Sequence, residues 1–554
     1  MEKIIKVNSG GREYPLREEI RKCSCWTEFN ITDKDLEFLD MVSPVYKGIK
    51  YTIPAPTLCP KCRHQRRLAW RNERKLYKRT CDTTWKNIIS VFSPDKPYPV
   101  YSSDEWWSDR WNPLDYGPAD GIDFSRPFFE QMNELINIVP KLAIVNFNSE
   151  NSDYTNISAD NKDCYLIVES SNNENSFYSY WLQLSKDTID SAYVNNSALC
   201  YECTSIDNSY NLKYCHRCMD CKDSYFLNDS EWCSYCFACQ DLQWKKFHIF
   251  NKEVTEAEYI AFVDKFQNWT KEQKEDIAIK TAFFFESKWP REPRIKMSEN
   301  CSWDYIIGSK DCIDVIDAND AENCRHSTDV WRNARDVMDG NTCGRNAAKC
   351  YEVTNCAVDV QNMLFCAMNW INQTDSTYCF YCANSSNLFW CVGLHSPHSY
   401  CILNKQYTKE EYEDLVPKII EHMKKTWEWW EFFPASISPF GYNETVAMEY
   451  YPIERRDAIN RVSTDGRTIF NWSDYENPKP DVSKIIPASK LPENIKDIPE
   501  DILNWAIECD RTKRPYRIIK AELDFYRRQS LPIPKLHPDE RHIDRMKLRN
   551  PKKL

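Results

Sequence analysis

Residues 200–239, CYECTSIDNSYNLKYCHRCMDCKDSYFLNDSEWCSYCFAC, indicate most clearly how the middle of the chain folds. Cys200, Cys218 and Cys236 recur at a constant spacing, and short polar-aromatic segments recur about every 10 to 12 residues. The segments are too short and too broken by Asn, Asp and Ser for helices, so they indicate brief strands. A short fixed period is typical of a solenoid. We therefore predict stacked β-coils in which the cysteines form ladders.

This pattern occurs twice along the chain. The matching segments are 161–164 and 309–312, 186–190 and 335–339, and 200–202 and 350–352. Each copy ends in a capping box, at Thr255 and at Thr408, followed by an apolar helical stripe. The sequence therefore predicts a mainly β fold with two tandem β-solenoids, each capped by a helix that covers open strand edges.

Glycine is scarce, with 11 residues in a chain of 554. Asparagine and aspartate must then supply most left-handed turn conformations, because they tolerate a positive φ better than other residues do. The regular recurrence of the solenoid aspartates therefore fits a turn-forming role better than an acid–base pair. No phosphate-binding loop, zinc-protease motif or nucleophile elbow is present.

Two close cysteine pairs near the start of the chain predict a metal site. Cys23-Ser-Cys25 is followed by Cys59-Pro-Lys-Cys62, and four thiolates on two turns suit a structural zinc ion. Reduced thiols in a small core are the alternative. The chain holds 26 cysteines and shows no signal peptide, so metal ligands and free thiols are favoured over disulfides. For the solenoid cysteines, core thiols, an additional metal and an iron–sulfur cluster all stay open.

A basic segment follows the second cysteine pair. Residues 63–79 contain eight Lys or Arg and one acid, lack Pro and Gly, and predict a helix. Its basic residues recur every three or four positions and predict one stripe. A stripe of like charges needs an anion, and phosphates of a nucleic acid would supply it. The candidate nucleic-acid-binding residues here are Arg63, Arg66, Arg67, Arg71, Arg74 and Lys78.

The same segment returns at the other end of the chain. Residues 536–554 match residues 58–76 at nine of nineteen positions without a gap. Cys59 becomes His537 and Cys62 becomes Glu540, so the second ribbon is degenerate. Either it holds no metal or a secondary site forms from Cys509, His537 and Glu540, while Cys81 is a possible substitute ligand in the N-terminal site. Its basic residues add four nucleic-acid-binding candidates, which are Arg541, Arg545, Arg549 and Lys552.

Residues 63–79 and 511–554 are basic, whereas the net charge of the whole chain is −11. The part of the chain between these two segments must therefore be acidic. This asymmetry indicates an anionic partner, or else basic ends that dock on the acidic middle. No apolar run reaches the length of a membrane span, so we expect a soluble, cytoplasmic protein without membrane contact. The expected domains are a zinc ribbon with a basic helix (1–85), a hairpin and linker helix (86–144), a first solenoid (145–290), a second solenoid (291–428), an aromatic and proline-rich strap (429–500) and a degenerate ribbon-like basic domain (501–554).

The phrases CPKCRHQRRLAWRNERKLYKR, FGYNETVAMEYYP and RIIKAELDFYRRQSLPIPKLHPDERH resemble those of an uncharacterised family of large cysteine-rich zinc-ribbon proteins from uncultivated bacteria with reduced genomes. The resemblance extends over nearly the whole chain and implies the same domain layout, without an activity. The Cys23-x-Cys25 pair departs from the usual ribbon spacing.

The leading functional prediction is a zinc-binding, non-enzymatic protein that binds nucleic acid, RNA in preference to DNA, or associates with ribonucleoprotein. A scaffold that binds a protein partner through its solenoid faces is the alternative. A carbohydrate-active enzyme on a β-solenoid is a further one.

Overall fold

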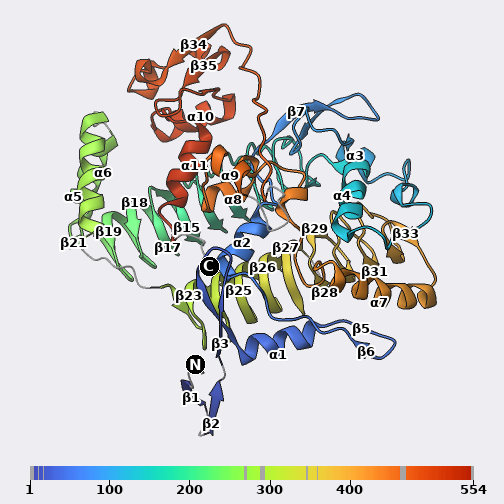
Figure 1. The fold of residues 1–554 in the computed structure, drawn as a ribbon. Coiled ribbons are helices and arrows are strands. Elements are labelled where there is room, and N and C mark those ends of the chain that lie inside the picture. The colour runs from blue at the N-terminus through green and yellow to red at the C-terminus, as the bar shows by residue number, and fades with distance from the viewer. Residues whose placement is uncertain are drawn as a thin grey trace. The chain divides into compact units, whose positions relative to one another are not determined.

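The computed structural model describes residues 5–9, 12–16, 18–267, 271–286, 293–344, 347–357, 360–461 and 469–550. The fold is mainly β, as predicted, and contains β-solenoid strands flanked by helices (Figure 1). The chain forms two compact units. Unit 1 comprises residues 1–143, 292–475 and 552–554, and unit 2 comprises residues 144–291 and 476–551. Each unit thus joins one solenoid to the module from the far end of the chain.

The solenoid of unit 2 is built from short parallel strands. Tyr180 pairs with Ala192, Ala192 with Thr204, and Thr204 with His216, so each of these steps in the numbering is one turn. Its longer strands are β13 (Tyr180–Gln183), β14 (Ala192–Asn195), β15 (Thr204–Asp207), β16 (Tyr210–Lys213), β17 (His216–Met219), β18 (Lys222–Asn228), β19 (Ser234–Gln240) and β20 (Lys246–Ile249).

Every third residue of this solenoid is a corner with a left-handed backbone. The run Asp187, Asp190, Tyr193, Asn196 has φ values of 47, 51, 56 and 44°. Four such corners close one turn. Asn and Asp fill many corners, as the scarcity of glycine predicts, although aromatic residues fill others.

The cysteine series does not follow the turn of the solenoid. A strand position recurs one turn later as Ala192 recurs at Thr204, which is a shorter step than the one from Cys200 to Cys218. The predicted cysteine ladders therefore do not run through Cys200, Cys218 and Cys236, because each step of that series makes one and a half turns.

Serine, cysteine and aliphatic residues such as Leu182 and Ile206 fill the interior of the solenoid. Ser191 Oγ donates a hydrogen bond to the carbonyl of Ile189 at 2.9 Å and accepts one from the N–H of Cys203, one turn later, at 3.1 Å. Cys203 repeats the first contact, because its Sγ donates to the carbonyl of Tyr201 at 3.4 Å. Serine and cysteine therefore make the same hydrogen bond to the carbonyl two residues earlier in this core. Cysteine can for this reason recur at any multiple of the three-residue period.

The solenoid of unit 1 follows the same plan with a less regular turn. Trp303 pairs with Val315, which is the spacing found in unit 2, whereas Val337 pairs with Cys350, so that turn is one residue longer. Its main strands are β23 (Trp303–Ile307), β24 (Ile313–Asn319), β25 (Glu322–Trp331), β26 (Arg335–Gly344), β27 (Cys350–Ala357), β28 (Gln361–Leu364), β29 (Ala367–Trp370), β30 (Thr374–Thr377), β31 (Ser386–Phe389) and β32 (Ser399–Ile402).

A helix follows each solenoid, and both predicted capping boxes form. Thr255 and Glu258 exchange side-chain-to-backbone hydrogen bonds at the start of α5 (Glu256–Gln267). Thr408 and Glu411 do so at α7 (Lys409–Lys425). The first aromatic residue of each helix packs on the last coils, with Tyr412 5.7 Å from Tyr400 between ring centroids. Unit 2 adds α6 (Lys271–Glu286).

The remaining elements flank the solenoids. The N-terminal module, residues 18–80, contains β3 (Glu18–Lys22), β4 (Glu28–Thr32), α1 (Asp33–Val42), α2 (Pro60–Leu68) and β7 (Tyr77–Thr80). The C-terminal module, residues 484–550, contains β34 (Lys484–Pro487), β35 (Trp505–Glu508), β36 (Pro515–Tyr516), α10 (Lys520–Gln529) and α11 (Pro538–Met546). Since β34 pairs with β35, this module begins before the predicted boundary at 501. Unit 1 also holds β8 (Asn87–Ser90), β9 (Val100–Tyr101), α3 (Ser103–Trp106), α4 (Phe128–Ile138), α8 (Val446–Tyr450) and α9 (Arg455–Asn460).

Candidate metal centre and arginine sockets

The four N-terminal cysteines come together from two local structures. Cys23 and Cys25 lie in the turn between β3 and β4, where the N–H of Cys23 donates to the carbonyl of Thr27 at 2.9 Å. Cys59 is the N-cap of α2, and Pro60 at the first helical position sets the chain direction. The four sulfur atoms all lie within 4.8 Å of one another. The structure thus confirms the predicted grouping.

The electrostatics of this cluster favour shared thiolate character. The hydrogen bond with Cys62 is the main cause that lowers the pKa of Cys59 to about 5. The same contact raises the pKa of Cys62. Thiolates rather than thiols bind soft or borderline cations, and four of them at this spacing suit a closed tetrahedral site. The cluster can therefore hold a metal ion, with no ligand position left open for catalysis.

Helix α2 directs its arginines into the solenoid of unit 1 and not into solvent. Arg63 Nε lies 2.7 Å and Arg67 Nη1 3.2 Å from the carboxylate of Asp339, a corner residue within β26. All three side chains are at most 2% exposed. Arg67 also donates to Asn341 at 2.8 Å. We call this site, Asp339 with its neighbour Glu352, the unit 1 socket.

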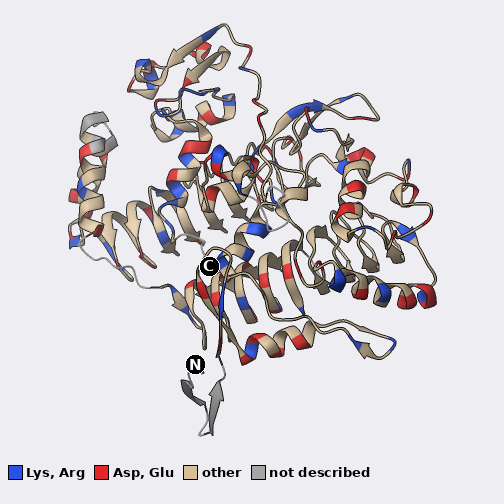
Figure 2. Cartoon of the chain, in the orientation of Figure 1, with Lys and Arg blue, Asp and Glu red and all other residues tan. Residues whose placement is uncertain are grey.

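Arg66 completes the contact on the adjacent turn of the solenoid. Its guanidinium donates two hydrogen bonds to Glu352, at 2.7 and 2.9 Å. It also pairs with Glu431 at 2.5 Å. Arg71 donates to Thr342 at 2.9 Å. In Figure 2 the basic helix α2 lies beside acidic positions on β26 and β27.

These positions correct the predicted nucleic-acid stripe in two respects. The helix ends at Leu68 rather than running to 79, and residues 77–80 form a strand. Arg63, Arg67 and Arg71 are buried, and Arg66 and Arg74 are partly buried, so only Lys78 of that set is exposed. The anion that offsets the arginine repulsion is a carboxylate of the chain itself. The docking of a basic end on the acidic middle, the second reading of the charge asymmetry, is what this unit shows.

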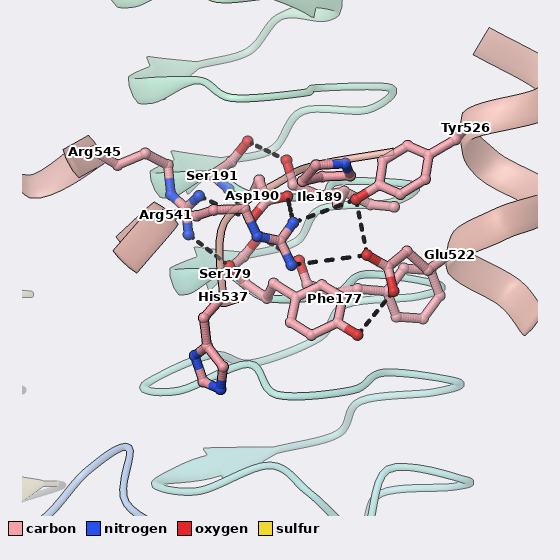
Figure 3. A network of polar contacts seen from close by, with 12 residues as sticks. Phe177, Ser179, Ile189, Asp190, Ser191, Glu522, Tyr526, His537, Arg541 and Arg545 are labelled. Atoms are coloured by element: carbon pink, nitrogen blue, oxygen red, sulfur yellow. Dashed lines mark hydrogen bonds and ion pairs between the residues drawn. The ribbon is translucent and has the colours of Figure 1, made fainter. Parts of the chain in front are cut away.

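Unit 2 repeats the arrangement with the C-terminal module (Figure 3). Arg541 and Arg545 of α11 both pair with Asp190, the latter at 2.8 Å. Arg545 also donates to the carbonyl of Tyr178 at 2.9 Å. The guanidinium of Arg549 lies 3.4 Å from the ring centroid of Tyr193. All three arginines are buried, so they too are absent from the surface, and Lys552 lies outside the described residues.

Two further carboxylates of unit 2 lie in this network and titrate abnormally. We call Asp190 and its neighbour Glu202 the unit 2 socket. Burial, followed by the charge of Asp190, raises the pKa of Glu202 to about 7. Burial is also the main cause that raises the pKa of Glu522 to about 7, although Tyr178 and Tyr526 each donate a hydrogen bond to it at 2.9 Å.

The secondary metal set is not brought together. Among the described residues, the four N-terminal cysteines form the one group able to hold a metal ion. His537 Nδ1 accepts the N–H of Asp539 at 3.1 Å as the N-cap of α11, and Glu540 pairs with Arg511 at 3.0 Å. Hydrogen bonds with Thr83 and Thr84 outweigh burial and lower the pKa of Cys81 to about 6.

In the C-terminal module, an ion pair is found at positions that correspond to cysteines of the N-terminal module. Arg511 stands two residues after Cys509, as Cys25 stands two after Cys23. It binds Glu540 and, at 2.7 Å, Asp544 of α11. Because Glu540 matches Cys62, a guanidinium–carboxylate contact ties turn to helix here.

The acidic residues of the two sockets were not among the functional residues predicted from the sequence. Asp190 and Asp339 lie in the matched segments 186–190 and 335–339, and Glu202 and Glu352 in the matched segments 200–202 and 350–352. These acids match between the two solenoids, and the arginines match between the two ends of the chain. The two sets of matching residues together could have indicated that the arginines bind the acids. Other solenoid acids act at corners, as predicted; Asp223 accepts a hydrogen bond from Asn211 at 2.7 Å.

No family model, curated protein or solved structure matches the chain. In the described part of the chain, no helix is both long and apolar enough to cross a membrane.

Proposed function

We propose that this protein is a non-enzymatic scaffold in which a structural zinc ion and two arginine helices lock the end modules onto the solenoids. The observation that carries the proposal is the sharing of one buried carboxylate by two arginines in each unit, Asp339 in unit 1 and Asp190 in unit 2. Arginines held in this way stabilise the fold and are not free to bind phosphate. The solenoid faces then remain as the surfaces for a protein partner.

Zinc is the metal that fits the N-terminal cluster best. Four cysteine sulfurs from two turns match the donor set of closed, structural zinc sites. The ion would join the β3–β4 turn to the first turn of α2, which also carries Arg63, and Arg67 follows one turn later. Zinc binding therefore fixes the helix that enters the unit 1 socket.

The test is zinc content and backbone exchange of the full-length protein. We expect one zinc per chain, its loss in Cys25→Ser and Cys62→Ser, and faster hydrogen exchange of α2 when zinc is removed. Cys81→Ser is the matched control and should keep both zinc and protection. Zinc-free protein with an equally protected α2 would refute the proposal.

Nucleic-acid binding remains a second candidate and is supported at a different surface. The corner that carries Asn196, Asn208 and Asp220 in earlier turns carries Trp232 and Trp244 in later ones. The two indoles stack in parallel, 4.5 Å apart between ring centroids with an interplanar angle of 3°, and Trp244 is 71% exposed.

Single-stranded nucleic acid suits this surface, because bases stack on exposed aromatic rings and phosphates follow nearby cations. Lys245 and Lys246 lie beside Trp244 and are both exposed. Binding of a single-stranded oligonucleotide across a salt series tests it. Trp232→Ala/Trp244→Ala should weaken binding at least about tenfold, as loss of base stacking does. Trp427→Ala, an exposed tryptophan of unit 1, is the control. Absence of binding at low salt would end this candidate.

A further inference from the structure

The two arginine helices and the two sockets are copies of one another, yet each helix occupies one socket. Arg63 and Arg541 stand at matching positions, as do Arg67 and Arg545. In both units this arginine pair binds the aspartate of the socket. A contact that both helices make equally gives no preference for either socket.

One position on the contact side differs in sign. Arg66 of α2 corresponds to Asp544 of α11 in the gap-free match. Arg66 lies between Glu352 and Glu431, with its side chain 14% exposed and that of Glu352 1% exposed. Asp544 is turned instead to Arg511, at 2.7 Å, and to Lys547, at 3.2 Å.

An exchange of helices would therefore be unfavourable at the unit 1 socket. Helix α11 placed there would bring Asp544 to Glu352 and Glu431, so that three carboxylates would meet in a largely buried contact, where Glu352 is 1% and Glu431 24% exposed. Like charges without a counter-ion in a buried contact disfavour the wrong partner strongly. Helix α2 meets the same two acids with a guanidinium.

The unit 2 socket is adapted to a helix without that arginine. Burial and the charge of Asp190 raise the pKa of Glu202, the counterpart of Glu352, to about 7, although the charges of Arg545 and Arg541 act against this shift. An acid from the C-terminal module itself, Glu522 of α10, supplies the second carboxylate near Arg541, at 3.8 Å. The unit 2 socket therefore binds α11 together with α10.

We propose that each socket is a docking site for one arginine helix, and that Arg66 and Asp544 determine which helix each socket binds. This inference rests on the proposed scaffold role of the sockets. It concerns the charge at one helix position and does not depend on zinc.

Hydrogen exchange of the zinc-loaded, full-length protein tests the proposal, with peptides that report α2 and α11 separately. Arg66→Asp should speed exchange of α2 at least about tenfold. Arg66→Met, which loses the attraction without adding repulsion, should have a smaller effect. Glu352→Gln added to Arg66→Asp should slow exchange of α2 again, because it removes the repelling charge. Exchange of α11 should stay unchanged in all variants.

The decisive comparison is the double variant. Recovery in Arg66→Asp/Glu352→Gln supports charge-based selection, since independent losses would add. Equal effects of Arg66→Asp and Arg66→Met, or a double variant worse than both singles, would overturn it. If Arg66→Asp fails to fold, Arg66→Met against Arg66→Met/Glu352→Gln gives the same comparison, with recovery again expected. Zinc content of each sample shows separately whether the metal site is intact.

Discussion

Arg67 and Asp339 form an ion pair whose two side chains are both 0% exposed, although the whole solenoid of unit 2 lies between them in the chain. Asp339 also binds Arg63, so this single carboxylate compensates two buried guanidinium groups. Burial of either charge alone is costly, because desolvation is not recovered without a partner. The pair therefore decides whether the N-terminal module can dock on the second solenoid.

Asp339→Asn should destabilise unit 1 strongly. The amide leaves two buried guanidinium groups without a counter-ion, which costs about 3–5 kcal/mol in comparable buried pairs. Denaturant unfolding measures the change. Asp336→Asn is the matched control: it lies one corner earlier, is partly exposed, and only accepts a hydrogen bond from Asn323 at 2.6 Å. It should change stability by less than about 1 kcal/mol, and equal effects of the two variants would show that the buried pair is unimportant.

The stability of unit 2 should fall as the pH rises toward neutrality. The folded-state pKa of Glu522 is about 7, above the ordinary value of 4.5. A raised folded pKa means that this carboxyl stabilises the fold below the ordinary value and that the contribution is lost as pH rises through about 7. The change should be on the order of 1–3 kcal/mol.

Glu522→Gln removes the titrating group and keeps an acceptor for Tyr178 and Tyr526. It should reduce the pH dependence of the free energy of unfolding of unit 2, measured by denaturant unfolding between pH 5 and 8, a range set by the two pKa values. Glu500→Gln, an exposed acid of the same module, should leave the slope as it is. A slope unaltered by Glu522→Gln would assign the pH dependence to another group.

Chelation and salt should act on different modules. A zinc chelator should release α2 and leave α11 protected, because the C-terminal turn and helix are joined by ion pairs of Arg511 with Glu540 and Asp544. High salt should weaken these partly exposed pairs, by about 1 kcal/mol or less. Arg511→Cys/His537→Cys/Glu540→Cys, together with Cys509, should raise zinc content from one to two ions per chain. A count that stays at one in the folded variant would contradict the correspondence of the two turns.

Cys221 should tolerate serine better than leucine. Cys221 donates to the carbonyl of Met219 at 3.3 Å, and its N–H donates to Ser209 Oγ, the same position one turn earlier, at 3.1 Å. Cys221→Ser should cost less than about 1.5 kcal/mol, whereas Cys221→Leu should cost about 1–3 kcal/mol through overpacking. Thermal unfolding measures both, and a serine variant as damaged as the leucine variant would point to a role for the thiol itself.

Local features were predictable because a few neighbouring residues encode them. The capping boxes at Thr255 and Thr408 need only a hydroxyl and a glutamate three residues apart, and the Cys59–Cys62 pair needs only one helix start. The length of the coil was not predictable from cysteine spacing. Serine replaces cysteine at interior positions such as Ser191. The cysteines therefore occupy only some of the positions of the three-residue period, and their spacing does not give the length of the coil.

Local patterns in the sequence were enough to predict the two solenoids, their capping helices, the cysteine cluster and two matching basic ends. Each depends on short-range periodicity or turn chemistry. The positions of the basic ends, in contrast, depend on long-range packing. Arg67 and Arg545 carry the same charge whether they face solvent, phosphate or an aspartate. Their role is set by burial beside Asp339 and Asp190, partners that lie far away in the chain and that no local pattern connects to them.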